Sequence, residues 1–152
     1  MSGPQIDYTA LYRQIPFPVA VLTPEFVIAD VNLAYLRAAR LSRDELLGRD
    51  IFEVFPGNPW DPGDAGVRDM RASLRRVLAT GQPGYMEFHR HDVEIPGSPG
   101  QFARRYWSAV NAPVFGPDGG VALIALCVEE VTDRMRRFMS ALEAEATYQD
   151  SG

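Results

Sequence analysis

The chain has 152 residues, of which 46% are hydrophobic and 23% charged, and it carries a net charge of −5 at neutral pH. These values are typical of one globular domain with a buried core, and the negative charge disfavours non-specific binding to nucleic acid. With one cysteine, no signal-peptide pattern and no apolar run near the ~20 residues of a membrane helix, we expect a cytoplasmic protein without a membrane span.

The first part of the chain predicts a helix followed by a hairpin. Residues 1–13 form a lead-in segment, whose apolar positions favour a helix over residues 6–13 that two following prolines end. Strands are predicted over residues 19–22 and 26–31, because each is a short apolar run and a Thr-Pro-Glu turn separates them.

Two helix starts follow the hairpin. Asn32 is of the residue type that caps a helix, here through about Arg40. Ser42 and Glu45 have the spacing of a capping box, so a second short helix should begin there. Gly48 should end that helix in the left-handed conformation.

The rest of the chain alternates loops, one helix and strands. Gly and Pro are frequent over residues 56–66, which predicts a loop, and an apolar stripe predicts a helix over residues 67–79. Three strands are then expected, over residues 85–95, 102–115 and 121–131. Turn-forming sequences separate them, so neighbouring strands should be antiparallel, and the fold class should be α+β.

Thr132 is expected to cap a final amphipathic helix over residues 133–147. Its apolar positions recur at spacings of three and four: Met135, Phe138, Met139, Leu142 and Ala146. This helix could pair in a dimer and pass a signal onward, or it could pack against its own domain.

Several short motifs occur in a characteristic order. They are Asn32, Gly48-Arg49, Asp118-Gly119 before the last strand, and Glu130-Val131-Thr132 at its end. In this order, and with these strands between them, the sequence resembles the PAS sensory domain family over about residues 11–132.

The resemblance implies a PAS domain over residues 14–132 and a signalling helix and tail over residues 133–152. The expected fold is a five-stranded antiparallel sheet with helices on one face and a cavity between them. Such cavities hold haem, flavin, a small metabolite or nothing.

The resemblance also implies a non-catalytic sensory module of a bacterial-type signalling protein. A homodimer and a downstream effector domain such as a histidine kinase or phosphatase would be its partners, with a small molecule in the cavity. The alternative is a ligand-free module for protein interaction. No phosphate-binding glycine loop, nucleophile elbow or zinc-protease motif is present in the sequence.

The cofactor stays undetermined. The covalent flavin branch of the family needs a cysteine near the middle helices, whereas Cys127 lies in the last strand, where a small buried hydrophobe is expected. Haem-binding members of the family usually ligate iron through a histidine from the helices, whereas His89 and His91 fall in a strand. With Glu87 they should share one face, which we interpret as an exposed polar strip without a metal.

The candidate ligand-binding residues lie mainly on the fourth strand. Arg105, Trp107 and Asn111 share one face by alternation, and the resemblance places that face at the cavity. Trp107 could stack on a planar metabolite, Asn111 could hydrogen-bond it, and Arg105 could bind a carboxylate. Tyr35 and Met70 could contribute from the helices. Alternatively, Trp107 only fills the core and Asn111 only satisfies a bend before a proline.

Overall fold

In the computed structural model, which describes residues 2–151, an antiparallel sheet has the strand order β2-β1-β7-β6-β3. The strands are β1 (Val19–Leu22), β2 (Ile28–Val31), β3 (Gly84–Arg90), β6 (Tyr106–Phe115) and β7 (Val121–Glu130). A separate ribbon pairs β4 (Val93–Glu94) with β5 (Phe102–Ala103). The expected five-stranded antiparallel sheet is confirmed.

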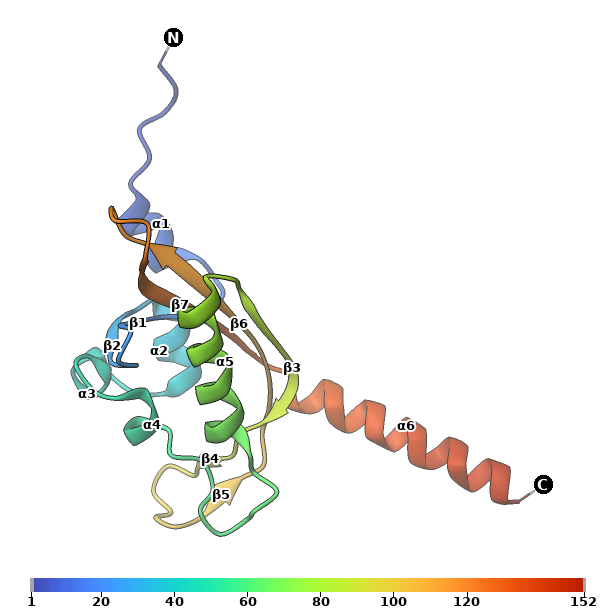
Figure 1. Cartoon of the computed structure of the whole chain (residues 1–152). Coiled ribbons are helices and arrows are strands. Elements are labelled where there is room, and N and C mark those ends of the chain that lie inside the picture. Colours follow the sequence, from blue (N-terminus) through green and yellow to red (C-terminus); the bar gives the residue numbers. More distant parts are fainter. Residues whose placement is uncertain (1, 152) are drawn as a thin grey trace.

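The helices between β2 and β3 cover one face of this sheet, and the last helix extends away from it (Figure 1). The helices are α1 (Tyr8–Gln14), α2 (Leu33–Ala39), α3 (Arg43–Leu46), α4 (Ile51–Val54), α5 (Gly66–Thr80) and α6 (Thr132–Asp150). This arrangement confirms the α+β class and the C-terminal helix.

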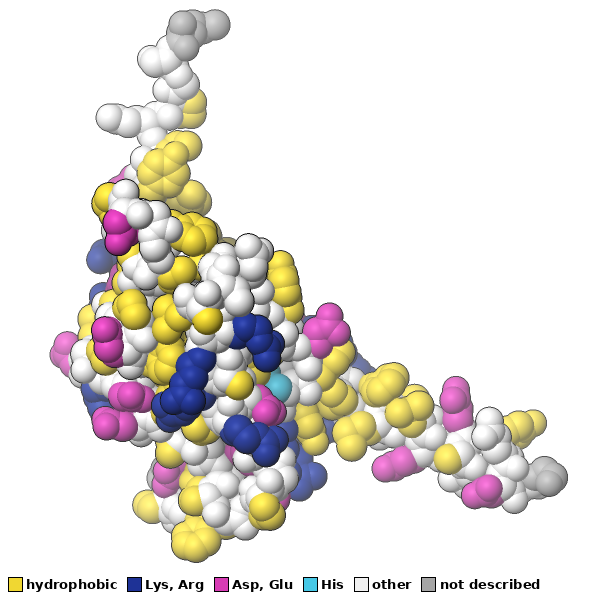
Figure 2. Space-filling model, in the orientation of Figure 1, with side chains coloured by type: hydrophobic (Ala, Val, Ile, Leu, Met, Phe, Trp, Pro, Cys, Tyr) yellow, Lys and Arg dark blue, Asp and Glu magenta, His cyan; other side chains and the backbone are white. Residues whose placement is uncertain are grey.

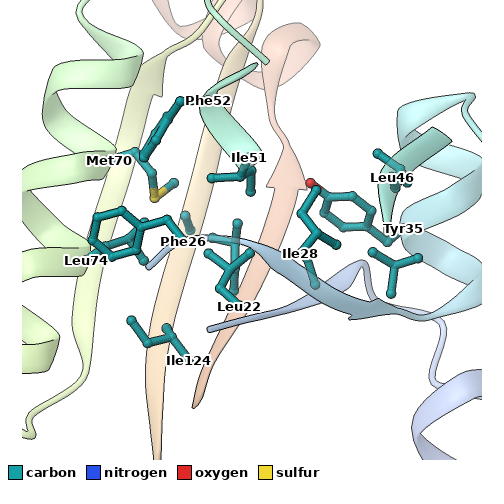
Figure 3. Close-up of a cluster of buried hydrophobic side chains, with 14 of the residues drawn as sticks. Leu22, Phe26, Ile28, Tyr35, Leu46, Ile51, Phe52, Met70, Leu74 and Ile124 are labelled. Carbon is teal, nitrogen blue, oxygen red and sulfur yellow. The ribbon is translucent and has the colours of Figure 1, made fainter. Parts of the chain in front are cut away.

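The core lies between the sheet and the covering helices. Leu22, Ile28 and Ile124 are fully buried on three strands. Figure 3 shows Ile28 beside Tyr35 of α2, with Leu74 and Met70 of α5 on the other side of the cluster. The inward positions of the strand residues follow from the alternation of side chains along each strand.

Asn32 joins three parts of the chain at the start of α2. Its Oδ1 accepts hydrogen bonds from the backbone N–H groups of Tyr35 and Val19, both at 3.0 Å. Its Nδ2 donates to the carbonyl of Phe17 at 2.8 Å and to that of Ile15 at 3.3 Å. The predicted helix cap is therefore confirmed, and the same side chain also fixes the segment that leads into β1.

The other caps were predicted with mixed success. Ser42 and Glu45 form the capping box, and Gly48 has a φ of 80° just beyond α3. The prediction for Thr132 was wrong. α6 has no side-chain cap, because the Thr132 hydroxyl accepts a hydrogen bond from the backbone N–H of Tyr106 at 3.0 Å.

Two predicted strands are interrupted, and one helix was not predicted. The strand expected over residues 85–95 ends at Arg90, because the backbone N–H of Asp92 donates to the side chain of Asp64 and not to a neighbouring strand. The strand expected over residues 102–115 is likewise broken between β5 and β6. α4 was missed, although Asp50 caps it by accepting from the N–H of Phe52.

Candidate functional site

A pocket of about 100 Å³ lies between the sheet and helices α2, α4 and α5. Its wall is almost entirely apolar, with histidines on one side. The lining residues are Tyr35, Ala38, Ala39, Ile51, Phe52, Phe55, Met70, His89, His91, Val93, Trp107, Leu126 and Val128.

Aromatic rings fix the shape of the helical wall. Tyr35 packs edge-on against Phe55, with 6.4 Å between ring centroids. Phe52 packs edge-on against Phe26, and the guanidinium of Arg71 lies 4.3 Å from the centroid of the Phe52 ring. Because these rings contact one another as well as the pocket, the wall is held in place without a ligand.

A bulge in β3 sets which side chains face the pocket. Met86 pairs with Ala109 and His89 pairs with Trp107, so β3 has one extra residue between these pairs. Phe88 occupies the bulge with a φ of 49° and is 49% exposed. The expectation that Glu87 shares a face with the histidines was therefore wrong, because a bulge shifts alternation by one residue.

The two histidines line the pocket, so their predicted place in an exposed strip was also wrong. Burial, together with the nearby His91, lowers the pKa of His89 to about 4. Burial also lowers the pKa of His91, although Asp64 and Asp92 oppose the shift. Both imidazoles are therefore neutral at pH 7.

Each imidazole has a buried nitrogen without a hydrogen-bond partner among residues 2–151. These atoms are Nδ1 of His89 and Nε2 of His91. The backbone carbonyl of Phe55 also raises the pKa of His91, against the effect of burial. A buried polar atom without a partner is unusual in a folded protein and calls for an explanation.

A polar cluster surrounds the two residues next to His91 in the sequence, Arg90 and Asp92. Arg90 binds Asp92 at 2.7 Å and Asp61 at 2.6 Å, which ties the loop before α5 to the end of β3. Burial would raise the pKa of Asp92, but hydrogen bonds from Arg90 and Asn58 outweigh it and lower that pKa. The cluster is charged yet internally paired, so its charges are already compensated.

Gly66 allows the first turn of α5 to lie against His91. A Cβ at this position would come within 2.4 Å of His91 Nδ1 and 2.7 Å of the Arg90 carbonyl oxygen. The site thus depends on a glycine that the sequence analysis had included only in a loop.

The structure separates the four predicted ligand-binding residues. Tyr35 and Trp107 lie together in the pocket wall. Asn111 is fully buried deeper in the core, where its Nδ2 donates to Ser73 Oγ at 2.9 Å. Arg105 is outside the lining and forms an ion pair with Glu130 at 3.1 Å.

The sequence analysis missed the pocket-facing role of the histidines. The available signal was a His-x-His pair in a strand beside Trp107, but the bulge that turns it inward has no glycine or proline to mark it. Cys127 is only half-buried, less than expected, and burial raises the pKa of its thiol. A reactive thiolate is thereby disfavoured.

Larger or charged cofactors find little support in this pocket. Its volume is well below the ~300–1,000 Å³ of sites for drug-sized ligands, so haem or flavin does not fit this arrangement. Residues 2–151 contain no cluster of three or more His, Cys, Asp and Glu that could hold a metal ion.

No helix in the described part of the chain is long and apolar enough to span a membrane.

Comparisons with known proteins agree on the fold. A family model described as PAS fold matches residues 12–136. No curated protein matches the chain. Many solved structures match the chain, and three of them illustrate the range of sequence identity.

The PAS domain of BvgS from Bordetella pertussis is 23% identical, with a TM-score of 0.59, over 91% of this chain and 93% of that one. A sensory box sensor histidine kinase from Vibrio cholerae is 19% identical, with a TM-score of 0.55, over 82% and 89% of the chains. The PAS domain of nitrogen regulation protein NR(II) from Vibrio parahaemolyticus is 11% identical, with a TM-score of 0.59, over 83% and 99%. At these identities the likeness establishes the fold.

Proposed function

The chain belongs to the PAS fold family, and from that membership we propose that it is a sensor whose pocket binds a small molecule and whose α6 passes the change onward. In this proposal it acts in the cytoplasm as a homodimer within a bacterial-type signalling protein. The receiver is an effector domain such as a histidine kinase or phosphatase, in line with the sensor histidine kinase among its structural neighbours.

The observation that carries this proposal is the pocket with unpaired histidine nitrogens in its wall. A domain used only for protein interaction has no need of such a space. Filling it with side chains would add packing contacts and remove the cost of unpaired polar atoms. The pocket therefore favours ligand binding over a purely structural module.

A short path joins the pocket to α6. Trp107 lines the pocket. The backbone N–H and carbonyl of its neighbour Tyr106 each make a hydrogen bond at the start of α6. The N–H of Tyr106 donates to the Thr132 hydroxyl, and its carbonyl accepts from the N–H of Val131 at 2.8 Å. Movement of the Trp107 segment would thus reach α6 through a single residue, as a shift between existing arrangements.

The proposal is tested by filling the pocket. Ala39→Leu adds a side chain into the lining, and Ala122→Leu adds the same side chain at an exposed position of β7. A library of one- and two-ring fragments is screened by ligand-observed NMR against both variants and the unchanged chain. We expect fragments that bind the unchanged chain and Ala122→Leu but not Ala39→Leu.

A bound fragment should also alter amide hydrogen exchange at residues 130–135. If no fragment distinguishes Ala39→Leu from the other two proteins, pocket sensing is wrong. The ligand-free interaction module then becomes the better description. The exposed apolar side chains of Phe138, Met139 and Leu142 on α6 are the observation that favours that second function.

A further inference from the structure

The pocket wall combines an apolar surface with two neutral imidazoles two residues apart. Nδ1 of His89 and Nε2 of His91 are both buried without a partner, on side chains that line the pocket. The outer torsion of a histidine side chain has broad energy wells, so a modest ring rotation presents either nitrogen to the pocket at little cost. Both nitrogens are shielded in the structure itself, so a ligand reaches them only through this rotation.

The hydrogen-bonding character of His91 follows from its other nitrogen. A neutral imidazole has one donating and one accepting nitrogen, so Nε2 of His91 accepts a hydrogen bond when Nδ1 carries the proton. His89 can supply an N–H at Nδ1. A hydroxyl group is both a donor and an acceptor on one atom, so a single hydroxyl can satisfy both nitrogens.

The surroundings disfavour a charged ligand. None of the described lining residues carries a charge at neutral pH. Among the nearby arginines, Arg90 binds Asp61 and Asp92, and Arg105 binds Glu130. Arg71 lies over the Phe52 ring and is outside the pocket lining. A buried charge without a counter-charge is costly, so a carboxylate or ammonium ligand lacks support.

The size and shape of the wall point to one ring. A cavity of about 150 Å³ lined by apolar side chains is known to hold benzene, and this pocket of about 100 Å³ is of the same order. Tyr35, Phe55 and Trp107 offer ring faces and edges to an aromatic guest.

We propose that the pocket binds an uncharged single-ring molecule with a hydroxyl group, which His89 and His91 hold by hydrogen bonds from Nδ1 and to Nε2. This inference rests on the proposed sensory function, because it specifies the ligand of the same pocket.

The test compares three probes of similar size. Phenol has the ring and the hydroxyl, toluene replaces the hydroxyl by a methyl group, and benzoate adds a negative charge. Trp60 is 77% exposed and does not line the pocket, so Trp60→Phe leaves Trp107 as the only tryptophan in the chain. Trp107 fluorescence then reports binding from the pocket wall, and ligand-observed NMR provides an independent affinity.

We expect phenol to bind about tenfold more tightly than toluene, as the gain of a buried hydrogen bond predicts, and benzoate to bind more weakly than either. His89→Leu combined with His91→Leu should abolish the preference for phenol and retain toluene binding. Tyr12→Phe is the matched control. It also removes a buried polar atom without a partner, but Tyr12 is outside the pocket lining, so the preference should persist.

Equal binding of phenol and toluene would overturn the hydroxyl assignment while leaving a pocket that binds small molecules. Tighter binding of benzoate would overturn the requirement for an uncharged ligand. A phenol preference that survives loss of both histidines would also overturn the inference. If none of the three probes binds, the inference about the ligand is also overturned. The fragment screen against Ala39→Leu is the separate test of whether the pocket binds any small molecule.

Discussion

Asn32 shows how much one side chain can organise in this fold. It is fully buried, and its amide group bonds to backbone atoms before β1, in β1 and in α2. A helix cap is a local feature, so the sequence was enough to predict it. The bonds to Val19 and Phe17 join residues more than twelve positions apart, and residue type alone does not reveal them.

Asn32→Ala should therefore cost more than the loss of an ordinary cap. We expect the free energy of unfolding to fall by about 3 kcal/mol, because several buried backbone groups lose their partner. Ser42→Ala, at the exposed capping box of α3, should cost about 1 kcal/mol. Urea unfolding of the three proteins gives the comparison, and equal losses in the two variants would contradict this account.

The pocket histidines should make stability depend on pH. Burial lowers the pKa of His89 from 6.5 to about 4, and the negative side chains of Asp69 and Asp64 oppose this only in part. Between these two pH values the unfolded chain binds more protons than the folded one, so stability falls as the pH falls. The loss attributable to His89 should be on the order of 3 kcal/mol.

The pH effect can be assigned by comparison with His89→Leu. Denaturant unfolding from pH 7 to pH 4 should show a smaller loss of stability in this variant than in the unchanged chain. Carboxylates titrate alike in both proteins, so the difference between the two curves isolates the imidazole. Parallel curves would mean that His89 is not buried as a neutral group.

At the scale of elements, the sequence predicted the sheet better than it predicted the site. β1, β7 and α5 were predicted to within a residue or two, because each has a clear apolar pattern and flanking turn residues. The bulge at Phe88 has no such signal, because a positive φ is uncommon for phenylalanine and the residue type does not predict it. The pocket depends on this bulge, so its histidines could not be placed from the sequence.

The break between β3 and β4 has a similar origin. Asp64 accepts hydrogen bonds from the backbone N–H groups of Asn58 and Asp92, both at 2.8 Å. The bond between Asp92 and Asp64 brings the loop before α5 to the end of β3, across 28 residues of sequence. Periodicity within the strand carries no information about such a distant partner.

The junction between β6 and α6 can be tested by a single substitution. Thr132→Val keeps the shape of the side chain but removes the acceptor for the N–H of Tyr106. We expect faster amide hydrogen exchange at Tyr106 and in the first turn of α6, with β1 unchanged, since the effect is local.

Thr147→Val is the matched control for this junction. The Thr147 hydroxyl donates only to a carbonyl of its own helix, Glu143 O at 2.9 Å, and the side chain is exposed. Its removal should leave exchange at the junction unchanged. If the two variants behave alike, the Thr132 hydroxyl does not hold α6 to the sheet.

At the scale of the whole molecule, α6 projects away from the sheet and the other helices (Figure 1). Its hydrophobic side chains are open to solvent along the projecting helix (Figure 2). Phe138, Met139 and Leu142 are 60%, 43% and 50% exposed, and their spacing is that of a helix-pairing seam. A second copy of α6 would cover this stripe.

We therefore expect Phe138→Glu together with Leu142→Glu to shift a dimer to the 16.9 kDa monomer in sedimentation velocity. Charges placed in the seam would repel between the two copies and would be costly to bury. Ala144→Glu, on the opposite side of the helix, should leave the dimer intact. A dimer that persists in the double variant would show that another surface mediates association.

The projection of α6 also has a mechanical consequence. Its 19 residues make a rigid arm about 28 Å long, at about 1.5 Å per residue. If its base at Thr132 turns by about 10°, its far end moves by about 5 Å, close to the pitch of one helical turn. A small displacement near the pocket would therefore become a large displacement at the C-terminal end of α6. There it would change which side chains contact a neighbouring helix.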